Sequence, residues 1–155
     1  MELSKFKEEY EKIAKKYKLP AFKELNNDFE IDKLDKENDN ILRAIRKVMM
    51  EKIVNSMAFL DMLVNPINAP RMYLPYIRTM SIEDKKIIDN LYSALADLSL
   101  LSLDLEIDSK EQKEAELINI VFKKWDESKS GFRQILINIK SPKSFNNRKE
   151  KSYLG

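Results

Sequence analysis

The sequence predicts an all-α protein: a single-domain bundle of four to six helices with a long proline-containing connection and a basic C-terminal tail. Three observations predict this class. Hydrophobic residues make up 43% of the 155 residues, which is enough for one core without disulfides or metals. The chain has only two glycines, so residues for tight β-hairpin turns are scarce. Apolar side chains also recur at intervals of three and four residues, which is the period of an amphipathic helix.

The N-terminal part of the chain predicts two helices of different length. Apolar residues that begin at Leu3 form one stripe, which predicts a helix over residues 4–18 that Pro20 ends. The apolar spacing continues over residues 22–34, but the polar run at 26–28 favours a turn. We therefore expect a short helix followed by irregular chain.

A wide apolar face runs from Ile41 to Val64 and predicts a long core helix. Either Asp39 or Asn40 can cap its N-terminus, because both side chains accept hydrogen bonds from free backbone N–H groups. The next segment, residues 65–80, contains three prolines, so we expect a long connection without helical hydrogen bonds. Because it is apolar and aromatic, we expect it to pack down on the bundle.

Ser81 followed by Asp84 is close to a capping box and predicts the start of another long helix. Between residues 95 and 107 apolar side chains occur on nearly every side of this helix. We therefore expect it to be the most buried helix, and we expect four of its leucines to lie in the core: Leu95, Leu98, Leu101 and Leu105.

The last helical region is predicted in two pieces. Ser109 and Gln112 offer a cap for a helix that extends to about Lys129, with Gly131 as its C-terminal cap. Residues 132–140 fit both a helix and an alternating strand, and we assign a helix because no partner strand is evident. Pro142 ends the helical domain, residues 1–142, and residues 143–155 are expected to form a basic, flexible tail.

Composition excludes several classes of chemistry. Without cysteine or histidine the chain has no disulfide, no thiolate nucleophile, no imidazole base and no cysteine or histidine zinc site. Two glycines are too few for a Walker loop or a dinucleotide-binding turn. We predict no cofactor and favour a non-enzymatic role. The charged N-terminus and the lack of a long apolar run predict a cytoplasmic protein without a membrane partner.

The favoured function is a helical module that contacts a macromolecule, most plausibly another protein. Its predicted contact surface is the connection at residues 65–80, because arginine and tyrosine are frequent at binding hot spots. The alternative for this segment is a structural one, a loop that caps one end of the bundle. The predicted contact residues are Asn68, Arg71, Tyr73, Tyr76 and Arg78.

Two other functions compete with this interpretation. Binding of RNA or DNA would use basic residues, although an isoelectric point of 8.6 is low for a dedicated nucleic-acid domain; these residues are Arg43, Arg46, Lys47, Lys143, Arg148, Lys149 and Lys151. A Mg²⁺-dependent nucleotide hydrolase would use carboxylates alone, and the candidate ligands share one helical face: Asp97, Asp104 and Asp108. The structural alternative for these aspartates is a solvated acidic face.

Overall fold

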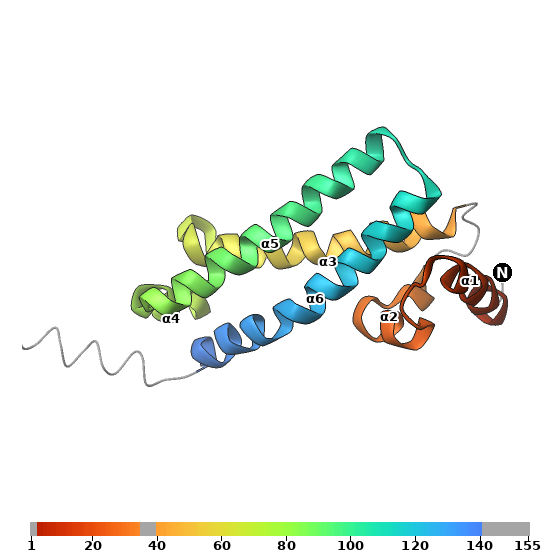
Figure 1. Ribbon diagram of the computed structural model, residues 1–155. Coiled ribbons are helices and arrows are strands. Elements are labelled where there is room, and N and C mark those ends of the chain that lie inside the picture. Colours follow the sequence, from red (N-terminus) through yellow and green to blue (C-terminus); the bar gives the residue numbers. More distant parts are fainter. Residues whose placement is uncertain (1–2, 35–39, 141–155) are drawn as a thin grey trace, which may run out of the picture.

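The computed structural model describes residues 3–34 and 40–140, and these residues form six α-helices and no strand (Figure 1). The prediction of an all-α bundle is confirmed. The helices are α1 (Leu3–Tyr17), α2 (Phe22–Phe29), α3 (Ile41–Val64), α4 (Leu74–Thr79), α5 (Ile82–Ile107) and α6 (Glu111–Lys140). Three one-turn 3₁₀ helices lie at Ile31–Lys33, Pro66–Asn68 and Arg71–Tyr73. The predicted tail at 143–155 lies outside the described ranges.

The core lies among the three long helices α3, α5 and α6, which all pack against one another. The short link between α5 and α6 makes them an antiparallel hairpin (Figure 1). The two N-terminal helices cover a different side of the bundle, since α1 contacts α2 and α6, and α2 contacts α3. Tyr10 fixes this corner, because its ring is fully buried and its hydroxyl donates a 2.6 Å hydrogen bond to the carbonyl of Pro20.

Two predicted helix starts are confirmed by their caps. The Asn40 side chain accepts a 3.1 Å hydrogen bond from the backbone N–H of Arg43 at the start of α3. The Ser81 hydroxyl accepts a 3.0 Å hydrogen bond from the backbone N–H of Asp84 at the start of α5. Both bonds satisfy N–H groups that the first turn of a helix leaves free.

The predicted break at Gly131 is wrong, because α6 is one continuous helix of 30 residues. Gly131 lies within it and has no positive φ, so it does not act as a C-terminal cap. A Cβ atom at this position would lie 3.0 Å from a methyl carbon of Leu91 on α5. The glycine therefore allows α6 and α5 to approach closely. The choice of helix for residues 132–140 is confirmed.

The connection at residues 65–80 is more regular than predicted. It holds two 3₁₀ turns and the six-residue helix α4. Its prolines are compatible with these elements, because Pro66 and Pro75 occupy the first turn of their helices, where a missing N–H group removes no hydrogen bond. Only part of the segment packs down: Tyr76 is buried, whereas the side chains of Ile67 and Met72 are exposed.

Candidate protein-interaction surface

Helix α5 has an apolar face on each of its two sides, and only one of them is covered. Leu95, Leu98 and Leu105 are buried in the core against α3 and α6. With about 100° of rotation per residue, three further apolar side chains lie close together on the opposite side of the helix. Leu100, Leu103 and Ile107 are 66%, 61% and 87% exposed. We call these three residues the α5 stripe.

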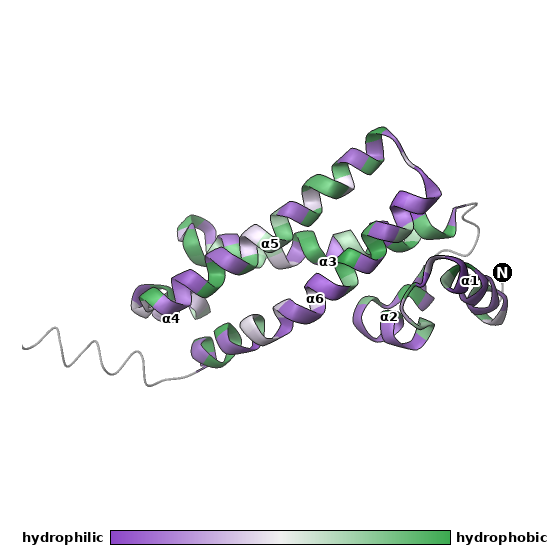
Figure 2. Cartoon of the chain, viewed as in Figure 1, coloured by the Kyte–Doolittle hydropathy of each residue, from purple (hydrophilic) through white to green (hydrophobic). Residues whose placement is uncertain are grey.

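This arrangement corrects the expectation that α5 is the most buried helix. Its neighbours α3 and α6 pack on one side, and α1 and α2 lie beside α6 and α3 instead of closing the far side of α5 (Figure 1). Leu101, which we expected in the core, is 47% exposed. Hydrophobic positions nevertheless continue along the C-terminal half of α5 (Figure 2). No element of residues 3–34 or 40–140 covers the α5 stripe.

A small groove between α5 and α6 extends this apolar surface. Its volume is about 210 Å³, and its floor contains the buried side chains of Leu105 and Leu117. Leu101 and Ile120 form its half-exposed rim. The charged residues that line the groove are Asp104, Lys113 and Glu116.

A row of three carboxylates separates the groove from the α5 stripe. Asp97, Asp104 and Asp108 follow one another at intervals of seven and four residues, so they form a line along α5. All three are exposed. Asp108 forms an exposed ion pair with Lys110 at 3.4 Å, whereas Asp97 and Asp104 have no ion pair in the part of the chain that the structure describes. We call these three residues the acidic row.

The acidic row does not assemble into the predicted metal site. Hydrolases of the kind considered above need carboxylates from a second helix, because a divalent cation takes six or more oxygen ligands. Within the described residues, no group of three acidic side chains is placed so that it could hold a metal ion. The three aspartates are exposed on α5, and the one acidic residue of α6 that lines the same groove as Asp104 is Glu116.

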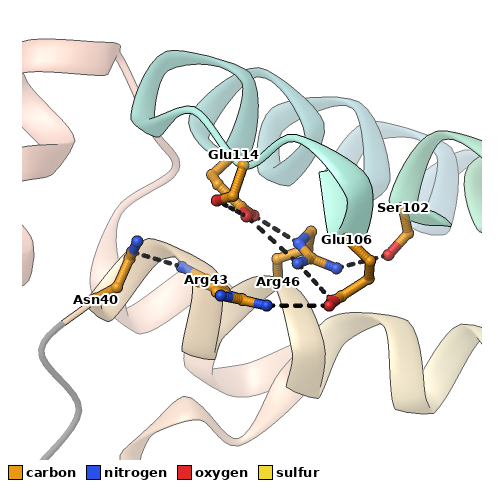
Figure 3. A network of polar contacts seen from close by, with 7 residues as sticks. Asn40, Arg43, Arg46, Ser102, Glu106 and Glu114 are labelled. Carbon is orange, nitrogen blue, oxygen red and sulfur yellow. Dashed lines mark hydrogen bonds and ion pairs between the residues drawn. The ribbon is translucent and has the colours of Figure 1, made fainter. Parts of the chain in front are cut away.

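Two of the three residues of the predicted basic patch on α3 form ion pairs within the chain (Figure 3). Arg46 is only 2% exposed, and its Nε donates to Glu114 at 2.5 Å while its Nη2 donates to Glu106 at 2.8 Å. Arg43 donates to the same Glu106 at 3.1 Å. Of the three residues predicted to bind phosphate on α3, only Lys47 is exposed. Arg46 is therefore buried and not available to bind phosphate. Sequence spacing does not reveal that α5 and α6 bring carboxylates to the two arginines.

The remaining contacts of this network fix the end of the α5–α6 hairpin. Arg46 also donates to the hydroxyl of Ser102 at 2.8 Å, and Ser109 donates to Glu114 at 2.9 Å. Hydrogen bonds from Arg46 and Arg43 hold the pKa of the Glu106 carboxyl below its ordinary value. Because Ser102 and Glu106 are neighbours of Leu103 and Ile107 on α5, the network holds the backbone beneath the α5 stripe in place.

The predicted contact residues of the connection are divided between the surface and the core. Asn68, Arg71 and Arg78 are exposed. Tyr76 is only 4% exposed. The pKa of its hydroxyl is raised, mainly by burial and to a smaller extent by the nearby Asp84 carboxylate. Tyr73 is half-buried and packs edge-on against Phe59, with 6.0 Å between the ring centroids. Tyr76 therefore serves packing, which corrects its predicted role as a contact residue.

The remaining predicted nucleic-acid residues are in the tail and lie outside the described residues: Lys143, Arg148, Lys149 and Lys151. The prediction combines them with the basic residues of α3. On α3, Arg43 and Arg46 are paired with carboxylates. These two arginines therefore do not form the free basic patch that the prediction combines with the tail residues.

A larger pocket, which no pattern in the sequence indicates, lies between α2, α3 and α6. Its volume is about 710 Å³, and Phe59, Phe132 and Leu136 form part of its apolar wall. Lys52 also lines it, but the Nζ of this residue donates to the Asp28 carbonyl and lies 4.9 Å from the centroid of the Trp125 ring. The Asp28 carboxylate in turn accepts a 2.8 Å hydrogen bond from Lys129. These charges are thus used to join the three helices.

Comparison of the chain with protein-family models, with curated proteins and with solved structures gave no match. In residues 3–34 and 40–140, no helix combines the length and the apolar character that crossing a membrane requires. A functional assignment therefore depends on the geometry described above.

Proposed function

We propose that the protein is a non-enzymatic helical module that binds another protein through the α5 stripe and the neighbouring groove. The observation that carries this proposal is the exposure of Leu100, Leu103 and Ile107 on one side of a helix whose other side is in the core. Contiguous exposed apolar side chains are typical of interaction sites, because leaving them in water costs free energy that a partner recovers.

The spacing of the stripe supports a protein partner. Its members are three, four and seven residues apart, which is the spacing by which one helix packs against another. The acidic row beside the stripe disfavours a nucleic acid on this face, because phosphates would meet Asp97 and Asp104. Among the basic residues of α3, Arg43 and Arg46 are already held by Glu106 and Glu114.

The test is isolation of the tagged protein from its native cells in three forms: unchanged, Leu103→Glu and Val54→Glu. Val54 is a matched control, because it is an exposed apolar residue (52%) on α3 and is not part of the α5 surface. We expect at least one protein to be retained by the unchanged chain and by Val54→Glu and to be lost with Leu103→Glu. An identical set of retained proteins for all three forms, or RNA alone, would contradict the proposal.

A further inference from the structure

The position of the acidic row restricts what the α5 surface can bind. The row lies between the α5 stripe on one side and the groove with Leu101 and Ile120 on the other. A partner that covers both apolar features must therefore also cover Asp104, and Asp97 lies one turn before Leu101 on the same line. Removing carboxylates from water without a counter-charge is costly, so such a partner must supply cationic groups at these positions.

In the part of the chain that the structure describes, carboxylates outnumber the cations near the acidic row. Lys113 lines the groove together with Glu116, and Lys110 is paired with Asp108. Asp97 and Asp104 have no ion pair with any other described residue. The surface is therefore acidic as a whole, and its complement is a segment with both apolar and basic side chains.

The shape of the surface favours a helix as this segment. The α5 stripe is the convex side of a helix, and from Leu100 to Ile107 it extends by about 10 Å along the axis. A second helix can place residues spaced by three, four and seven along this line. Addition of a β-strand needs an exposed sheet edge, and residues 3–34 and 40–140 form no strand.

Two other occupants fit the charges less well. A second copy that used the same surface would bring its own acidic row against the first, and facing like charges weaken association. A membrane with anionic lipids would meet the same repulsion. We infer that the α5 surface binds a basic amphipathic helix of another protein, with lysine or arginine placed beside its apolar stripe; this inference rests on the proposed function.

The test uses two labelled peptides and the full chain, with binding measured by fluorescence anisotropy. Both peptides carry leucines on one helical face, but one has lysines beside the leucines and the other has glutamates. We expect the lysine peptide to bind at least tenfold more tightly than the glutamate peptide and to weaken as salt is added. Equal binding of the two peptides, or no binding of the lysine peptide up to about 1 mM, would overturn the inference.

Variants connect the binding to the named residues. The double variant Asp97→Asn/Asp104→Asn should weaken the lysine peptide by about fivefold or more and reduce the salt dependence. The double variant Glu8→Gln/Glu9→Gln is the matched control, because it changes the net charge equally on the exposed side of α1. If the aspartate variant binds as tightly as this control, the inference is wrong.

Failure of this inference can be told apart from failure of the proposed function. If retention of a native partner depends on Leu103 but not on Asp97 and Asp104, the module binds protein and only the cationic partner is excluded. If retention is also independent of Leu103, the proposed function itself fails. Analytical sedimentation tests one more outcome. If the unchanged chain forms a dimer that Leu103→Glu dissociates, a second copy occupies the surface, and the inference of a basic helix as the partner is wrong.

Discussion

The buried ion pair between Arg46 and Glu114 allows a quantitative prediction about stability. The two side chains are 2% and 0% exposed, and they join α3 to the start of α6. Arg46→Met would leave the Glu114 carboxylate buried, with the Ser109 hydroxyl as its remaining hydrogen-bond partner. Removing one member of a buried pair typically costs about 3 to 5 kcal/mol, because the other charge stays in a medium of low dielectric constant.

Removal of Glu114 should cost less than removal of Arg46. In Glu114→Leu the guanidinium keeps its hydrogen bonds to Glu106 and Ser102, so its charge remains partly compensated. In the double variant neither charge remains, and apolar residues of similar volume replace both side chains. We expect the double variant to be more stable than Arg46→Met alone, since replacing a whole buried pair is often close to neutral.

The assay is urea unfolding of the four forms, followed by the circular dichroism of the helices. The free energy of unfolding should order the forms as unchanged chain and double variant above Glu114→Leu, with Arg46→Met lowest. The coupling between the two sites should be about 2 kcal/mol or more, in the range found for residues in direct contact. A cost below about 1 kcal/mol for Arg46→Met, or additive single effects, would refute the buried pair as described.

Three further predictions concern stability. Leu98→Ala should lower the free energy of unfolding by about 2 to 5 kcal/mol in urea melts, whereas Leu101→Ala, at a half-exposed position, should cost clearly less; equal costs would contradict the two faces of α5. Gly131→Leu should lower the melting temperature, because its side chain would overlap Leu91, and an unchanged value would mean that α5 and α6 separate easily. The pKa of Glu106 is lowered in the folded chain, so its contribution is present above its ordinary pKa of 4.5 and is lost as the pH falls below it. The stability difference between the unchanged chain and Glu106→Gln should narrow over that acid range, and a difference independent of pH would contradict this assignment.

Local signals in the sequence predicted most helix boundaries correctly. The caps Asn40 and Ser81 and the stop at Pro20 act through neighbouring backbone groups, so the sequence contains all the information that they need. The prediction for Gly131 is wrong because a glycine has two different uses in helices. Next to Ser130 and after a lysine it is typical of a helix end, and only the position of Leu91 reveals that it serves close packing instead.

The polar sites could not be predicted in the same way, because their members come from different helices. Arg43 and Arg46 lie on one face of α3, which correctly indicated that they are close together. Whether such a face meets solvent or carboxylates depends on Glu106 and Glu114, which lie more than 50 residues further along the chain. The periodicity of one helix contains no information about the helix that packs against it. The arginine of a buried ion pair is therefore predicted as part of an exposed cationic patch.

The exposed side of α5 could not be predicted for the same reason, because the sequence of one helix does not show what covers each of its sides. The sequence places apolar residues on both sides of this helix, and that pattern predicts that both sides are covered, but it does not say by which chain. Within the described residues, α3 and α6 cover the side with Leu98 and Leu105, while Leu100, Leu103 and Ile107 remain in water. The burial that the sequence predicts for this half of α5 is thus met on one side by the bundle. On the other side we propose that a partner provides it, and the charges of the acidic row favour a partner with basic side chains.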